Sequence, residues 1–239
     1  MKWIYYLIVI KKKHIMKNIL KLSLLFIVIA ISTLASCDKD CDRPDVSIYE
    51  FVLPFELSPA KEVYNIGDTI TISANIPNSI YERKTNQNFI LENTKFYLTA
   101  YIYDMDTNII DYSDINRFII IFEELVDGQI FTYSDGHSSI LSQFKYANNT
   151  YKYSIKIVCK SKGLFVLFQG TNIYTFGEDR LMFAKQCDNT KIDAKVYMNN
   201  RGDNNLNLAN SAKNEHYKKW VERKEKYLDY GGYCFRVVD

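Results

Sequence analysis

The chain has 239 residues, of which 15% are aromatic, with only 9 glycines and 4 prolines, a composition typical of a packed globular protein rather than a low-complexity chain. Six of its 30 basic residues and none of its 28 acidic residues lie at positions 1–36, so residues 37–239 carry a net charge of −4. This acidic balance excludes the basic surface that nucleic-acid binding requires.

The start of the chain has the organisation of an export signal. A basic segment at 16–21 precedes an apolar run at 22–31, which is shorter than the ~20 apolar residues of a membrane-spanning helix. The run leads to Leu34-Ala35-Ser36-Cys37, and this order of parts resembles the signal of bacterial lipoproteins. The resemblance implies that residues 1–36 are removed and that Cys37 receives fatty-acyl chains such as palmitate, which anchor it to a membrane. The alternative is an uncleaved anchor helix in which Cys37 is incidental.

Residues 1–15 lie upstream of this signal and contain a second apolar stretch at 3–10. We interpret them as the result of a translation start placed too far upstream of Met16. Cleavage before Cys37 yields the same mature chain from either start.

Residues 37–45 are expected to form an acidic tether. Asp38, Asp40 and Asp42 follow Cys37 closely, and so short a charged segment cannot bury enough surface to fold. The stretch resembles the export tag of bacteroidete-type lipoproteins, which implies a place on the outer membrane facing the cell exterior. Without that export role, the tether holds the protein on the periplasmic face.

Residues 46–239 are expected to form one β-sandwich domain. Apolar and polar residues alternate strictly in 69–76 and 96–102, which is the pattern of half-buried strands. Further strand candidates, separated by turn-forming pairs at 127–128, 135–136, 148–149 and 162–163, are 117–123, 129–133, 140–146, 151–159, 164–169, 180–186 and 192–198. Many short strands without intervening helices predict a mainly β fold, an antiparallel immunoglobulin-like or jelly-roll-like sandwich.

One amphipathic helix is predicted at about 211–228, with Ser211 as its N-cap. Its apolar positions at helical spacing are Tyr217, Trp220, Val221 and Leu228. Lys218, Lys219, Arg223 and Lys224 occupy the other face, and residues 233–238 read as a closing strand. We expect this helix to pack on the sheet; the alternative is a basic helix lying on a membrane surface.

Two short motifs carry a resemblance to a family. Tyr64-x-Ile66-Gly67-Asp68-Thr69-Ile70 and the closing Gly231-Gly232-Tyr233-x-Phe235-x-Val237 resemble uncharacterised bacteroidete-type lipoproteins, many of which have immunoglobulin-like β-sandwich portions. The resemblance implies the fold, and it implies no catalytic activity.

Catalytic and metal-binding patterns are scarce. Only His137 and His216 follow Cys37, which leaves too few histidines for a three-histidine zinc site, and we predict neither a metal nor a cofactor. Asp104-x-Asp106-x-Asn108 has the opening spacing of a calcium loop, but it lacks the later glycine and glutamate and is better interpreted as a hairpin tip. Glu123 and Glu124 are adjacent, so on a strand they would point to opposite faces.

The strongest functional pattern is a row of tyrosines. Tyr97, Tyr101 and Tyr103 share the strand face opposite Phe96, Leu98 and Ile102. Exposed rings on a sheet can stack on the apolar faces of sugars, so these three tyrosines are candidate ligand-stacking residues. The alternative is that both faces of the strand are covered, because tyrosine is common in strands.

Cys41, Cys159, Cys187 and Cys234 remain once Cys37 is lipidated, and they allow three pairings. Cys187 ends one strand candidate and Cys234 lies in another, so this pair is the predicted disulfide.

Together these patterns predict a lipid-anchored β-sandwich protein, not an enzyme, with a binding or structural role at the outer membrane. Its expected partners are the membrane, through Cys37, and a glycan or another surface protein. The alternative is a metal-independent carboxylate hydrolase acting on a glycan.

Overall fold

The computed structural model of the chain describes residues 47–109, 113–173, 191–219 and 222–239. Internal contacts divide the chain into two units, Met1–Arg43 and Pro44–Asp239, and all described residues belong to the second unit. The predicted signal peptide, Cys37 and the whole acidic tether therefore lie outside the described residues. In the described ranges, no helix is long and apolar enough to cross a membrane.

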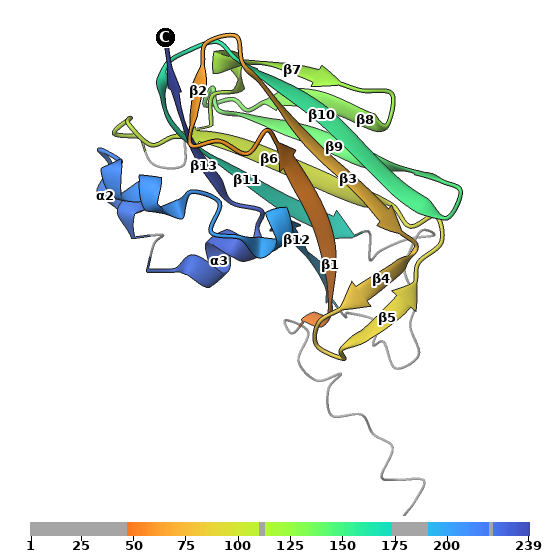
Figure 1. Cartoon of the computed structure of the whole chain (residues 1–239). Helices are drawn as coiled ribbons and strands as arrows, with labels where there is room; N and C mark the ends of the chain where they lie inside the picture. Colours follow the sequence, from red (N-terminus) through yellow and green to blue (C-terminus); the bar gives the residue numbers. More distant parts are fainter. Residues whose placement is uncertain (1–46, 110–112, 174–190, 220–221) are drawn as a thin grey trace, which may run out of the picture. The chain divides into compact units, whose positions relative to one another are not determined.

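The described residues of the second unit form a mainly β structure whose strands belong to one curled sheet (Figure 1). The strands are β1 (Ser47–Ser58), β2 (Val63–Asn65), β3 (Thr69–Pro77), β4 (Ser79–Glu82), β5 (Gln87–Ile90), β6 (Phe96–Asp104), β7 (Phe118–Phe122), β8 (Val126–Thr132), β9 (Ser138–Ala147), β10 (Thr150–Cys159), β11 (Gly163–Ile173), β12 (Lys191–Met198) and β13 (Tyr233–Val238). The candidate strand at 180–186 lies outside the described residues.

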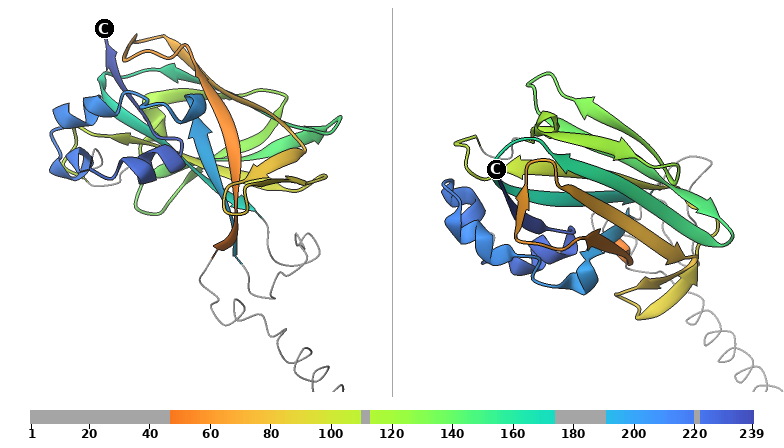
Figure 2. Two further views of the ribbon diagram at one scale, coloured as in Figure 1. Left: turned by 60° about the horizontal axis from the view of Figure 1, so that its bottom comes forward. Right: turned by 45° about the horizontal axis from the view of Figure 1, so that its top comes forward.

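The sheet curls into two facing layers (Figure 2). One layer runs β12-β1-β3-β10-β7, and the other runs β8-β9-β6-β11-β13-β2. The layers are joined through β9, whose last residues pair with β10, while the β4–β5 hairpin extends from β1. The prediction of a mainly β sandwich is confirmed.

Two strand pairs are parallel, whereas the sequence predicted an antiparallel sandwich. β1 pairs with β12, and β2 pairs with β13, in both cases in the parallel direction. Each pair joins a strand from the beginning of the domain to one near its end, so the intervening chain provides the long connection that a parallel pair requires.

The main apolar core lies between the two layers. Along β6, the alternation predicted from the sequence places Phe96, Leu98, Ala100 and Ile102 inside, each no more than 1% exposed. Aromatic rings meet edge to face across the core, with centroid distances of 5.6 Å for Phe55–Phe144, 4.8 Å for Phe96–Tyr151 and 5.0 Å for Phe118–Phe165. Such pairs contribute ~0.5–1.5 kcal/mol each beyond the area they bury.

A second apolar cluster lies on the outer side of β11 and β13, under a short helical segment (Figure 1). The segment comprises η4 (Leu206–Ser211), α2 (Glu215–Lys218) and α3 (Lys224–Asp229); two further 3₁₀ turns are η2 (Ile115–Arg117) and η3 (Asn199–Arg201). Tyr217, Tyr227 and Leu228 are buried against Val166 and Cys234. The helical segment therefore packs on the sheet, as the sequence predicted, while Trp220 and Val221 of its predicted apolar face lie outside the described residues.

The predicted single helix at 211–228 is instead divided into two short α-helices. Asn214, rather than Ser211, caps α2, since its side chain accepts a hydrogen bond from the His216 N–H. Arg223 has a non-helical backbone before α3. At 3.6 residues per turn, a straight helix would place Tyr217 and Tyr227 about 80° apart. In the structure both rings are buried, one from each short helix.

Not all of the pairs predicted to form turns do so. Asn148 and Asn149 form the β9–β10 hairpin turn, with φ of 52° and 58°. The pair Asp127-Gly128, however, lies inside β8. A Cβ on Gly128 would come within 2.3 Å of the Phe122 ring, so this glycine provides space for a ring rather than for a turn.

Candidate functional site

Tyr97, Tyr101 and Tyr103 lie on the outer face of β6 and are half-buried, while their neighbours fill the core. The predicted shared face is therefore confirmed. The rings of Tyr101 and Tyr103 are parallel within 4°, with their centroids 5.7 Å apart. This is the separation expected of side chains two positions apart on one strand face.

Tyr101 and Tyr103 form the floor of a hollow of about 460 Å³, which we call the tyrosine hollow. Phe168 of β11 completes the floor; it pairs with Tyr101 in the β6–β11 ladder, and its ring centroid lies 6.1 Å from that of Tyr103. The helical segment supplies the wall, which consists of His216, Arg223, Lys226, Tyr227 and Tyr230. A volume of this size is within the ~300–1,000 Å³ of small-ligand sites.

The aromatic floor is held from two sides. The Tyr227 ring packs edge to face on Phe168 at 5.7 Å, and its hydroxyl donates to the Asn204 carbonyl at 2.7 Å. On the other side, the Tyr101 hydroxyl is hydrogen-bonded to Tyr133, whose ring stacks on His137 at 3.9 Å. These contacts fix the rings before any ligand arrives, which lowers the entropic cost of binding.

Burial, followed by the hydrogen bond with Tyr133, raises the pKa of Tyr101 to about 12. The pKa of Tyr133 is lowered, first by its hydrogen bond with Ser139 and then by that with Tyr101. Tyr101 therefore stays a neutral phenol near neutral pH. Its role in the hollow is that of a ring surface and a hydrogen-bonding hydroxyl.

The charged side chains that line the tyrosine hollow are all positive. Arg223 and Lys226 line it, and none of its lining residues is acidic. Gln169 also lines the hollow, but the alternation along β11 directs its buried side chain toward the sandwich interior, where the amide has no hydrogen-bond partner among the described residues. The polar side chains that line the hollow apart from Gln169 are therefore tyrosines, His216 and the two cations.

The candidate residues predicted from the sequence are only partly brought together. Tyr101 and Tyr103 join the hollow, whereas Tyr97 lies four positions earlier on β6 and does not line it. Phe168, Tyr227 and Tyr230 were missed, as were the two cations of the wall. Alternation in the candidate strand 164–169 could have placed Phe168 on the outer face of the sheet. The helix pattern, by contrast, placed Arg223 on a solvent-exposed face and gave no sign of the hollow.

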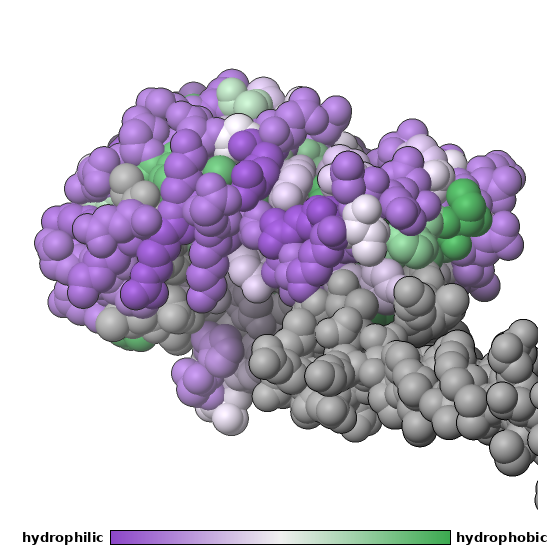
Figure 3. All heavy atoms as spheres, turned by 90° about the horizontal axis from the view of Figure 1, so that it is seen from below, coloured by the Kyte–Doolittle hydropathy of each residue, from purple (hydrophilic) through white to green (hydrophobic). Residues whose placement is uncertain are grey.

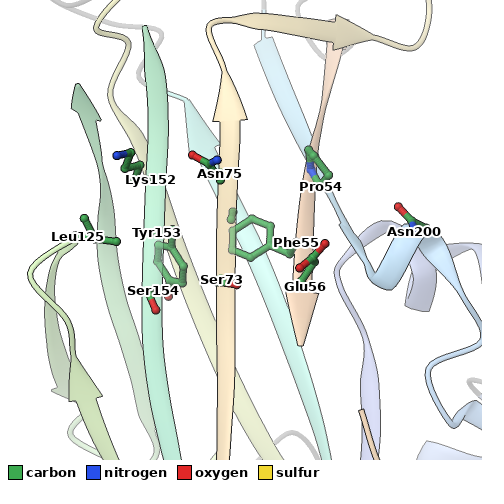
Figure 4. A pocket seen from close by; sticks show the side chains of 11 residues that line it. Pro54, Phe55, Glu56, Ser73, Asn75, Leu125, Lys152, Tyr153, Ser154 and Asn200 are labelled. Carbon is green, nitrogen blue, oxygen red and sulfur yellow. The ribbon is translucent and has the colours of Figure 1, made fainter. Parts of the chain in front are cut away.

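A second hollow, of about 690 Å³, lies over β1, β3 and β10 (Figure 4). Its polar lining includes Glu56, Asn75 and Lys152. The two rings that contribute to it, Phe55 and Tyr153, are each only 1% exposed and belong to the main core. This hollow therefore offers hydrogen bonds but no accessible ring face, and the tyrosine hollow is the better candidate site.

Cys159 and Cys234 are buried and form no disulfide with each other, and burial raises the pKa of the Cys234 thiol to about 12. Cys41 and Cys187 lie outside the described residues, so the Cys187–Cys234 disulfide stays a prediction.

The other residues considered for catalysis or metal binding make structural contacts. No group of three or more His, Cys, Asp or Glu side chains suited to a metal occurs in the described part of the chain. The Asp104 carboxylate pairs with Arg117 and also accepts the Asp106 N–H at 2.8 Å, as in a turn. His137 pairs with Asp135 in the β8–β9 turn, and the Ser138 hydroxyl accepts the Ile115 N–H at 2.9 Å.

No protein-family model matches the chain, and no curated protein matches its sequence. Among solved structures, it is similar to a non-cellulosomal cohesin from the archaeon Archaeoglobus fulgidus, at 10% identity and a TM-score of 0.32, covering 80% of this chain and 91% of the other. It is also similar to a human F-spondin reeler domain, at 10% identity and a TM-score of 0.29, covering 66% and 100%. A cohesin module from a Clostridium perfringens family 33 glycoside hydrolase gives 13% identity and a TM-score of 0.27, covering 61% and 99%.

Similarities this low assign neither a family nor a function to the chain. The resemblance to bacteroidete-type lipoproteins finds no support in them and stays a prediction.

Proposed function

We propose that the mature chain is a lipid-anchored binding protein of the outer membrane that holds a glycan in the tyrosine hollow. The observation that carries this proposal is the walled aromatic floor of Tyr101, Tyr103 and Phe168. Sugar rings have apolar faces that pack on aromatic rings, while their hydroxyls bond to polar groups at the edge. The anchor at Cys37 is supported by the sequence motif alone.

A binding role is better supported than hydrolysis. A carboxylate glycosidase needs two acidic side chains facing one cleft, about 5–9.5 Å apart. None of the residues lining the tyrosine hollow is acidic, and the second hollow has only Glu56. The proposal is therefore binding without catalysis, and release of new reducing ends from a bound oligosaccharide would contradict it.

The proposal is tested with the full chain, purified in detergent, on an array of immobilised oligosaccharides followed by calorimetry. We expect Tyr103→Ala to weaken glycan binding about tenfold, because a lost stacking contact of ~1.4 kcal/mol corresponds to that factor. Tyr103→Phe should retain most of the affinity. Tyr97→Ala is the matched control, since Tyr97 is on the same strand face but outside the hollow.

Equal losses for Tyr103→Ala and Tyr97→Ala would show that the hollow is not the site. Failure of the wild type to bind any saccharide, or capture of a surface protein in place of one, would overturn the glycan assignment. Circular dichroism of each variant establishes that the losses do not reflect unfolding.

A further inference from the structure

The wall of the tyrosine hollow contains two cations that lie side by side. Arg223 precedes α3 and Lys226 is in its first turn, where the Lys226 N–H donates to the Arg223 carbonyl at 3.0 Å. Both side chains are exposed, and both line the hollow.

Neither cation has an ion pair with a described residue, a property they share with the exposed Lys219 and Lys224 but not with the cations that pair across the fold. Arg83 pairs with Glu50 and Asp229, Arg117 with Asp104, Arg201 with Glu225 and Asp229, and the buried Lys195 with Asp193. Those pairs stabilise the fold by neutralising charge. Arg223 and Lys226 line one hollow as like charges, and neither has a described carboxylate within 4 Å, so an anion bound between them would reduce their repulsion.

The positive charge of the hollow is a local property. Residues 37–239 carry a net charge of −4, so the surface as a whole does not attract anions. Seen from below, the surface where the helical segment lies is mostly hydrophilic (Figure 3). An anion would therefore be drawn to the hollow by the two cations beside it rather than by the overall charge of the protein.

We propose that the glycan held in the tyrosine hollow is acidic, a sugar unit bearing a carboxylate or a sulfate ester. Arg223 and Lys226 bind its negative group, and the planar guanidinium of Arg223 suits two oxygens of one carboxylate. The ring of the same sugar unit packs on Tyr101 and Tyr103. This inference rests on the proposed function and deepens it by assigning the charge of the ligand.

The test compares three tetrasaccharides by calorimetry with the full chain in detergent: galactose, galacturonate and sulfated galactose. We expect one of the two anionic tetramers to bind at least about tenfold more tightly than the neutral one. Which of the two binds more tightly shows whether the recognised group is a carboxylate or a sulfate ester. The double variant Arg223→Gln/Lys226→Gln should lose about tenfold or more for that tetramer, the range expected of charge-assisted hydrogen bonds.

The matched control is Lys219→Gln/Lys224→Gln, which removes the same charge from exposed residues of the same segment that do not line the hollow. It should change affinity by less than about twofold, a bound set by the weak, screened action of distant surface charges. Equal losses in the two double variants would overturn the inference, since the attraction would then be unspecific.

The outcomes separate this inference from the function beneath it. If all three tetramers bind equally and Tyr103→Ala weakens the binding of each, the result supports a glycan site in the hollow and contradicts its preference for acidic glycans. If none of the tetramers binds and the array shows no saccharide binding either, both the glycan-binding function and the acidic specificity are contradicted.

Discussion

Glu82 is a fully buried carboxylate at the end of β4, with no exposed surface. It accepts hydrogen bonds from the Glu50 N–H at 2.7 Å, from the Thr85 N–H at 2.8 Å and from the Thr85 hydroxyl at 2.6 Å. Burial acts to raise its pKa, but the hydrogen bonds from Thr85, Glu50 and Lys84 outweigh burial and lower it. One side chain thus closes the β4–β5 turn and joins it to β1.

This lowered pKa predicts a pH dependence of folding. Because the folded-state pKa of Glu82 lies below its ordinary value of 4.5, its ionised form stabilises the protein above that pH. The contribution is lost as the pH falls through the folded-state pKa. Glu82→Gln should therefore lower the free energy of unfolding at pH 7 by ~1.5–3 kcal/mol, measured by urea denaturation, and by less at pH 3.5.

Glu56→Gln is the control, because Glu56 is exposed on β1. It should shift the unfolding midpoint little at either pH. If Glu82→Gln and wild type differ by the same amount at both pH values, ionisation of Glu82 does not contribute to stability.

Among the elements, β13 is a strand of the second layer, and the helical segment covers the outer side of that layer. β13 lies between β2 and β11, and its Tyr233 and Phe235 are each 1% exposed. Tyr217 and Tyr227 are buried under the segment to a similar degree. The end of the chain is therefore part of the main fold, and the wall of the tyrosine hollow depends on it.

A chain that ends at Asn210 is predicted to be insoluble or molten. It loses four buried aromatic residues, and each such loss costs ~3–5 kcal/mol against a total stability of ~5–15 kcal/mol. Thermal unfolding followed by near-ultraviolet circular dichroism measures the effect. Within the full chain, Tyr227→Ala should lower the melting temperature strongly, whereas Lys224→Ala, at an exposed position, should not.

Cooperative melting of the shortened chain near the full-length temperature would contradict this prediction. The segment would then be peripheral, and the membrane-surface interpretation of its basic face would be favoured.

For the molecule as a whole, the proposed lipid anchor at Cys37 would hold the protein on a membrane. Cys37→Ser removes the sulfur that would carry the lipid, so labelling with an alkyne fatty acid should be lost, and the variant should remain an unprocessed precursor or become soluble. Two or more acyl chains, at ~0.8 kcal/mol per buried CH₂, make membrane attachment effectively permanent, which a single chain does not. Membrane fractionation of cells expressing either form measures this change.

Full fatty-acid labelling of the Cys37→Ser variant would overturn the anchor. The export tag is tested separately by replacing Asp38, Asp40 and Asp42 with alanine, which should leave labelling intact but protect the protein from external protease. Unchanged protease access would contradict the tag alone.

Sequence patterns predicted most strands after residue 69 and the buried faces of two of them, but they did not predict β1, β2, β4 or β5. Alternation in 69–76 and 96–102 predicted which residues of β3 and β6 enter the core, and it placed Tyr101 and Tyr103 together on the outer face. This information is local, because the pleat of a strand sends successive side chains to opposite faces whatever the rest of the chain does.

The side chains that surround Tyr101 and Tyr103 become known only from the three-dimensional fold. Phe168 is placed beside them by the β6–β11 register, and Arg223 and Lys226 line the same hollow from the start of α3. Gly128 is likewise explained only by the Phe122 ring that packs against it. Such neighbours are distant along the chain, and they are set by strand register and by the burial of the largest side chains, which no local periodicity encodes.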